Sequence, residues 1–108
     1  MQEDVVQMAE FFKALGDPTR LKILRLLTSY PERKLCVGAI AQRLGITQPA
    51  VSQHLKVLKH VRLVEPNREG YRVHYAVNRD TMEVWKEQWD ELNRSGVEQA
   101  PCEGDCEE

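Results

Sequence analysis

The sequence predicts a mainly α-helical domain with one small β-hairpin. Its 108 residues suit a single hydrophobic core, and its composition, 42% hydrophobic and 30% charged, is typical of a folded chain. Apolar side chains recur at steps of three and four residues over most of the sequence, which is the period of an amphipathic helix. Residues 71–77 instead alternate between apolar and polar side chains, as a strand does.

Two helices are expected in the first 29 residues. Residues 4–15 place apolar side chains on one face, and Gly16 ends this helix. Asp17 and Pro18 favour the start of a second helix over residues 18–29, because Asp accepts a backbone N–H bond and Pro lacks a donor that would be unpaired there. This helix is predicted to be buried on most sides, since its apolar residues form no single stripe: Leu21, Ile23, Leu24, Leu26 and Leu27.

The middle of the chain predicts two further helices. Residues 35–44 form the shorter one, which Gly45 ends. Thr47 is a favourable N-cap for the next helix, from Gln48 to about His60, whose inward face holds Val51, Leu55 and Leu58.

The remaining residues predict a hairpin, a last helix and a tail. The β-prone segments 63–65 and 71–77 flank a loop at 66–70, and Asn78 or Asp80 caps the helix that follows. No periodicity continues beyond Ser95. We therefore expect one domain over residues 1–95 and an acidic, cysteine-containing tail over residues 96–108.

The two middle helices have the spacing of a helix-turn-helix. Ala41, four residues before Gly45, allows close approach of the helices, Gly45 accepts a left-handed conformation, and Val51 packs the second helix onto the first. The hairpin, with Arg68 at its tip and Arg72 beside it, would be a basic wing. The combination predicts a winged helix-turn-helix.

The charge distribution favours a nucleic-acid partner. Residues 18–79 carry twelve Lys and Arg residues against three acids, whereas residues 80–108 carry two against ten. A basic centre between acidic ends is typical of a binding face carried by helices that do not bind. From charge alone, a solvated surface without a partner stays an alternative.

Several segments resemble the ArsR/SmtB family of winged helix-turn-helix repressors over residues 4–94. They are Phe12–Leu24 (FKALGDPTRLKIL), Leu35–Gly38 (LCVG), Val51–Leu58 (VSQHLKVL) and the strand pair down to Tyr75. The resemblance implies a dimeric transcriptional repressor of bacteria or archaea that leaves its operator when an effector binds, typically a metal or metalloid ion.

The exposed face of the second helix-turn-helix helix is predicted to bind double-stranded DNA, because this helix enters the major groove. We expect base contacts from Gln48, Ser52 and Gln53, and phosphate contacts from Lys56, Lys59, Arg68 and Arg72. His54 suits either a core or capping role or a base contact, and the family's Ser-x-His-Leu pattern favours a position near DNA. A solvated helix face is the favoured interpretation of Arg20 and Lys22.

The first and last helices are predicted to form a homodimer. The residues expected at the interface are Val5, Met8, Phe12, Met82, Trp85, Trp89 and Leu92. A core within one chain is the alternative, and the resemblance favours the dimer. A two-fold dimer places two recognition helices roughly 34–36 Å apart, as a palindromic operator requires.

The metal sites of the family are incomplete in this sequence. Asp80 is followed two positions later by Met82, where the zinc type has His, and Cys36 keeps only the first thiol of the thiolate type. A lone Cys36 is more often a small buried apolar residue.

Cys102 and Cys106 remain as candidate ligands in the tail. They could bind a thiophilic ion such as arsenite, cadmium or mercury, or form a reversible disulfide, with a third ligand from Cys36 or the other subunit. An inert tail and another effector are the alternatives, so no cofactor is certain.

These observations favour a cytoplasmic DNA-binding repressor. No apolar run approaches the length of a membrane span, and the residues predict neither a catalytic triad nor a closed metal motif, so we expect no enzyme. A winged-helix module that binds protein or RNA without a small effector is the alternative. Gln48, Ser52 and Gln53 discriminate between the two, because they predict sequence-dependent binding to a DNA duplex.

Overall fold

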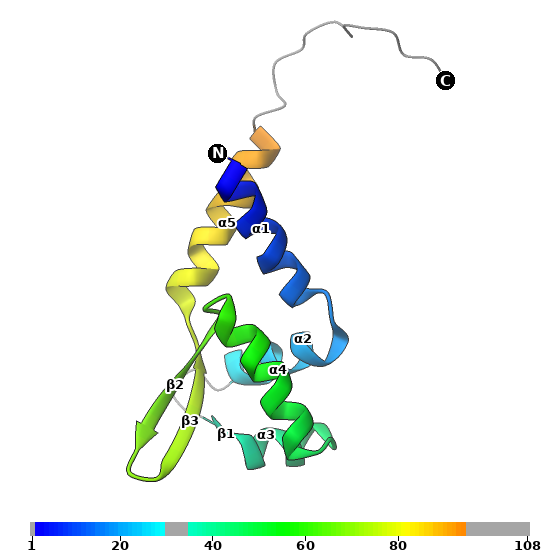
Figure 1. The fold of residues 1–108 in the computed structure, drawn as a ribbon, viewed down its shortest axis with the longest axis vertical. Coiled ribbons are helices and arrows are strands. Elements are labelled where there is room, and N and C mark those ends of the chain that lie inside the picture. The colour runs from blue at the N-terminus through cyan, green and yellow to red at the C-terminus, as the bar shows by residue number, and fades with distance from the viewer. Residues whose placement is uncertain (1, 30–34, 95–108) are drawn as a thin grey trace, which may run out of the picture.

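A computed structural model describes residues 2–29 and 35–94 (Figure 1). In chain order, its elements are α1 (Gln2–Leu15), α2 (Pro18–Thr28), β1 (Leu35–Cys36), α3 (Val37–Leu44), α4 (Gln48–His60), β2 (Val64–Glu69), β3 (Arg72–Val77) and α5 (Arg79–Arg94). The predicted mainly α fold with a β-hairpin is confirmed. The predicted tail over residues 96–108 lies outside the described residues.

Polar caps fix where three helices begin. The Asp17 Oδ2 atom accepts the Arg20 backbone N–H at 3.0 Å, and the Thr47 Oγ1 atom accepts the Ala50 N–H at 3.2 Å. Both caps were expected. For α5, where two residues were candidates, Asn78 is the cap, because its Oδ1 atom accepts the Thr81 N–H at 3.2 Å.

The sheet differs from the prediction in two respects. It has three antiparallel strands in the order β1-β3-β2, since Leu35 and Cys36 form a short strand instead of starting α3. The expected loop at 66–70 is largely strand: Glu69 pairs with Arg72, and the turn is only Gly70 and Tyr71. Gly70 has a φ of +63°, a conformation that glycine adopts without steric cost. Pro66 fits into β2 because β2 is an edge strand.

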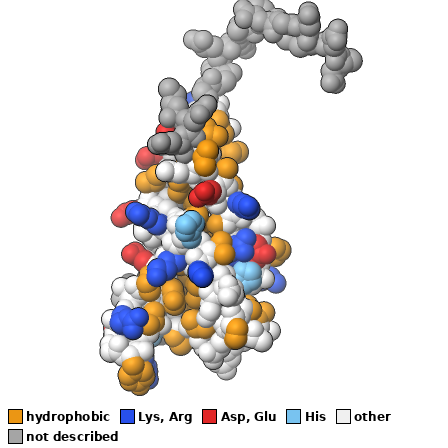
Figure 2. All heavy atoms as spheres, viewed as in Figure 1, with side chains coloured by type: hydrophobic (Ala, Val, Ile, Leu, Met, Phe, Trp, Pro, Cys, Tyr) orange, Lys and Arg blue, Asp and Glu red, His pale blue; other side chains and the backbone are white. Residues whose placement is uncertain are grey.

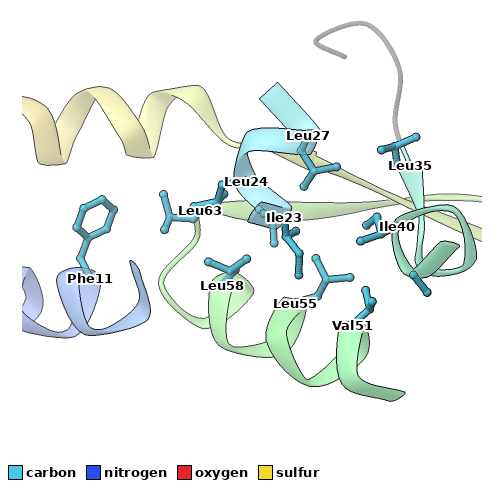
Figure 3. Packing of buried hydrophobic residues seen from close by; sticks show 12 residues of the cluster. Phe11, Ile23, Leu24, Leu27, Leu35, Ile40, Val51, Leu55, Leu58 and Leu63 are labelled. Atoms are coloured by element: carbon cyan, nitrogen blue, oxygen red, sulfur yellow. The ribbon is translucent and has the colours of Figure 1, made fainter. Parts of the chain in front are cut away.

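The core lies between α2, α3, α4 and the base of the sheet (Figure 3). The side chains of Val51, Leu55 and Leu58 on α4 point towards Ile23 of α2, and all four are at most 1% exposed. The prediction for α2 was too broad, because Leu21 is 49% exposed. This helix packs against α1, α3, α4 and β3, which leaves the side of Leu21 free.

The two outer helices, α1 and α5, lie side by side at the other end of the molecule (Figure 1). They are joined by aromatic rings: Phe11 stacks on Trp85, and Phe12 meets Trp89 edge-on, both with centroids 5.3 Å apart. Among the described residues, α5 contributes no fully buried side chain. No helix of this part of the chain has the length and apolar character that crossing a membrane requires.

Candidate nucleic-acid interface

The turn between α3 and α4 has the geometry that its sequence predicts. Gly45 adopts a left-handed conformation with φ +68° and ψ +34°, and its N–H and that of Ile46 both donate to the Ala41 carbonyl, at 2.9 and 3.1 Å. The Ala41 side chain is buried and Val51 is completely so. Close packing at these two residues fixes the angle at which α4 leaves α3.

The helix α4 has one buried and one exposed face. Because Val51, Leu55 and Leu58 point into the core, the helix surface beside and opposite this stripe carries exposed polar side chains: Gln48, Ser52, Gln53, Lys56 and Lys59. These are the five α4 residues other than His54 that were predicted to contact DNA. The structure brings them together on one surface with both hydrogen-bonding and positively charged groups.

His54 has a different environment from the other predicted contact residues. Its side chain is 24% exposed, and its Nδ1 atom lies 3.4 Å from the Arg20 Nη1 atom and 3.8 Å from the Asp17 Oδ2 atom. Since Arg20 can only donate, this hydrogen bond requires Nδ1 to act as an acceptor, which leaves the proton of a neutral imidazole on Nε2. His54 therefore connects α4 to the start of α2.

Arg20 does not lie on a solvated face as the sequence suggested. Its Nε atom donates to the Ala14 carbonyl and its Nη2 atom to the Lys13 carbonyl at 3.4 Å, both in the last turn of α1. The guanidinium donates to carbonyl groups at a helix end, where intrahelical N–H donors run out. It shares the Lys13 carbonyl with the Gly16 N–H, which lies 3.2 Å from the same oxygen. Sequence spacing did not indicate this contact, because it joins three helices. Lys22 is exposed, as expected.

Asp17 completes this cluster at the junction of α1, α2 and α4. The backbone N–H that Arg20 donates to the carboxylate lowers the pKa of Asp17 below its ordinary value of 3.8, and the positive charge of the Arg20 side chain lowers it further. The carboxylate is 31% exposed and remains the N-cap of α2.

The two basic residues of the wing point to opposite sides of the hairpin. Arg68 pairs with Val73 and Arg72 pairs with Glu69, so strand alternation places Arg68 on the face that contains Tyr75 and Arg72 on the other. Both side chains are exposed. Arg68 lies within β2, whereas the tip is formed by Gly70 and by Tyr71, which is 89% exposed. The expectation that Arg68 is the tip residue was wrong because the loop is shorter than predicted.

The residues predicted at the dimer interface are largely uncovered in the single chain. Phe12, Met82, Trp89, Leu92 and Val5 are 36–63% exposed, while Met8 and Trp85 are half-buried. Phe12, Met82 and Trp89 help to line a hollow of about 510 Å³ between α1, α2 and α5. Packing within one chain thus explains why Trp85, which stacks on Phe11, is half-buried. It leaves most of the other predicted interface residues at the surface. Phe11, which the predicted stripe omitted, is the residue of α1 that joins the core.

The described residues contain no cluster of three or more His, Cys, Asp or Glu side chains suited to a metal ion. Cys36 is half-buried and faces His74 across the β1–β3 pair. Cys102 and Cys106, the predicted thiol pair, lie outside the described residues.

Comparison with known proteins agrees with this architecture. Residues 17–65 match the model of the family described as bacterial regulatory protein, arsR family. The chain is 39% identical over 90 residues to the "Transcriptional repressor SmtB homolog" of Synechocystis sp., an alignment that covers 82% of this chain and 66% of the relative. It is 40% identical to an HTH-type transcriptional regulator of Methanocaldococcus jannaschii, covering 78% of this chain and 93% of that one.

A third relative and a solved structure extend the comparison. The chain is 32% identical to the "Cadmium resistance transcriptional regulatory protein CadC homolog" of Staphylococcus aureus, over 71% of this chain and 62% of the relative. The fold is similar to the homodimeric winged helix-turn-helix DNA-binding domain of a Mycobacterium bovis protein, with a TM-score of 0.68 and 29% identity, covering 95% and 93% of the two chains.

Proposed function

Because the chain belongs to the ArsR/SmtB family of DNA-binding transcriptional repressors, we propose that it represses transcription as a homodimer that binds an operator through α4 and the wing. The observation that carries this proposal is the surface of α4. Five polar side chains are exposed on the helix surface outside the buried stripe of Val51, Leu55 and Leu58, and the hairpin that follows α4 carries two exposed arginines.

The proposed contacts follow from side-chain chemistry. Gln48, Ser52 and Gln53 have the donors and acceptors that read base edges in the major groove. The positively charged side chains contact phosphates, which fix the position of the protein on the duplex without reading its sequence. These are Lys56, Lys59, Arg68 and Arg72. His54, held by Arg20 and Asp17, positions α4 beside the proposed DNA contacts.

The uncovered stripe of α1 and α5 supports the homodimer. Exposed aromatic and aliphatic side chains gathered on two adjacent helices are typical of an interface, and the similar Mycobacterium bovis domain is homodimeric. Two-fold symmetry would present two α4 helices to successive major grooves, roughly 34–36 Å apart.

The test compares a residue proposed to read bases with one proposed to contact phosphate. Gln53→Ala is expected to reduce the preference for the chain's own promoter over random duplex DNA. Arg68→Ala is expected to weaken binding to both and to lower the slope of log affinity against log salt concentration by about 1. Fluorescence anisotropy titrations at several salt concentrations measure both effects. Equal binding of wild-type protein to promoter DNA, random DNA and duplex RNA would favour a module without sequence recognition.

For the effector, we propose a thiophilic metal or metalloid ion, such as arsenite, cadmium or mercury, bound by Cys102 and Cys106. Thiolates select soft ions, and two cysteines four positions apart can reach one ion. The relative from Staphylococcus aureus is a cadmium resistance regulator, which supports this class of effector. A third ligand would come from Cys36 or from the other subunit.

The double variant Cys102→Ser/Cys106→Ser tests the thiol proposal. Arsenite or cadmium is expected to release wild-type protein from its promoter and to leave the double variant bound. Cys36→Ser, which retains the tail thiols, shows whether the third ligand comes from the domain. Equal release of wild type and double variant would exclude the tail from the mechanism.

A further inference from the structure

A groove runs between α1 and α4. It lies beside the exposed polar residues of α4 that are proposed to contact DNA, here called the reading face: Gln48, Ser52, Gln53, Lys56 and Lys59. Its volume is about 830 Å³, and its lining includes Glu10, Lys13 and Arg20 on one side and Gln53, Lys56 and Lys59 on the other. Figure 2 shows Lys, Arg and His side chains gathered over the middle of this face of the molecule. Gln53, Lys56 and Lys59 belong both to this groove and to the proposed reading face, so the two surfaces are continuous.

The groove carries an excess of positive charge. Four Lys and Arg side chains line it, and Glu10 is its one acidic residue. Within residues 2–29 and 35–94, none of the four forms an ion pair with a carboxylate. Asp17 lies close enough to Arg20 to balance part of its charge. Glu10 lies one helical turn from Lys13 on α1, so one carboxylate stands against the charges of Lys13, Lys56 and Lys59 in the groove. Unpaired cations in a groove raise the local concentration of anions.

Arg20 gives the groove a fixed wall. Its guanidinium donates to the Ala14 and Lys13 carbonyls at the end of α1 and to His54 of α4. These bonds hold the two sides of the groove at a set separation. The carbonyl of Lys13 takes part in this arrangement, but its side chain stays exposed and available to a ligand.

We propose that this groove binds the phosphate backbone of the DNA duplex next to the bases contacted by α4, with Lys13 of α1 as a phosphate contact. This proposal rests on the proposed function and extends the DNA-binding surface from α4 and the wing to α1. The groove chemistry also suits a free polyphosphate. Continuity with Gln53 and Lys56 favours the DNA backbone, because a duplex seated on α4 brings phosphates to the rim of the groove.

The salt dependence of duplex binding tests the contact, because each neutralised phosphate contributes about 0.9 to the slope. Lys13→Ala is expected to lower the slope by about 1 on the chain's own promoter and on a random duplex of equal length. Lys13→Arg keeps the charge and is expected to keep the slope. Lys22→Ala removes an exposed charge outside the groove and serves as the matched control. A slope for Lys13→Ala equal to that of wild type overturns the proposal.

Two further outcomes separate the possible ligands and the two proposals. A calorimetric titration with inorganic tripolyphosphate at constant ionic strength tests whether the groove binds a free polyphosphate. If tripolyphosphate binds wild type but not Lys13→Ala, and the salt slope of DNA binding is the same for both proteins, the groove is a small-anion site. This outcome would overturn the assignment to DNA. A slope that falls on both duplexes in a protein without preference for its promoter would support the groove and contradict the sequence-specific repressor.

Discussion

The two ends of the molecule differ in how completely they bury their apolar side chains. At the helix-turn-helix end, Ile23, Ile40, Val51 and Leu58 are inaccessible to solvent. At the other end, α5 has no fully buried side chain among the described residues, and Trp89 and Leu92 are about half exposed. The helix-turn-helix end thus has a core within one chain, whereas the α1–α5 end has apolar surface that a second copy would cover in the proposed homodimer.

This difference separates two kinds of stability. Packing within the chain holds α4 at its angle to α3 whatever the protein concentration, since its contacts are intramolecular. In the proposed homodimer, the α1–α5 end would gain stability from association, which depends on concentration by mass action. Substitutions at the two ends should therefore give distinguishable results.

Leu55→Ala should give the largest effect. Leu55 is 1% exposed on the buried face of α4, and removal of a fully buried leucine side chain costs about 2–5 kcal/mol of unfolding free energy. Urea unfolding followed by circular dichroism measures this cost. Val57→Ala, on the same helix but 38% exposed, is the matched control and should cost much less. A similar cost for both would show that the core assignment of α4 is wrong.

Trp89→Ala should act mainly on association. Buried aromatic residues at an interface cost about 2 kcal/mol or more when truncated, which corresponds to roughly a 30-fold rise in the dimer dissociation constant. Sedimentation equilibrium measures this constant. Tyr71→Ala removes another exposed aromatic side chain, at the wing tip, and should leave the dimer dissociation constant unchanged. An unchanged dimer in Trp89→Ala would place the interface elsewhere.

Asp17→Asn should give the smallest effect, at the junction between the two ends. Because the fold lowers the pKa of Asp17, the ionised carboxylate stabilises the folded state above the ordinary value of 3.8, and this contribution is lost as the pH falls through the lowered pKa. Asparagine can still cap α2 but has no charge. The difference in unfolding free energy between wild type and variant should therefore stay constant well above pH 3.8 and shrink as the pH falls below this value. A difference independent of pH would contradict the charge interaction.

Features set by neighbouring residues could be predicted from the sequence. Asp17 and Thr47 cap the helices that they precede, and the spacing of Ala41, Gly45 and Val51 gives the helix-turn-helix. Each of these depends on hydrogen bonds or packing within about ten residues. The polar surface of α4 could also be predicted from the sequence, because the buried positions of an amphipathic helix determine which of its positions are exposed.

Features that depend on distant residues were missed. The strand Leu35–Cys36 is too short for a periodic pattern and forms because β3 offers it a partner. The bond between Arg20 and His54 joins side chains 34 positions apart. On α1, periodicity could not decide which of two adjacent apolar stripes packs inward, so Phe11 was overlooked in favour of Phe12.

The position of β3 at the centre of the sheet has a consequence for docking. It pairs with β1, which leads directly into α3, and with β2, which follows α4. One strand thereby ties the hairpin to both ends of the helix-turn-helix, so their relative orientation is set before any ligand arrives. Such pre-organisation reduces the conformational entropy lost on association, and more of the contact free energy is retained as affinity.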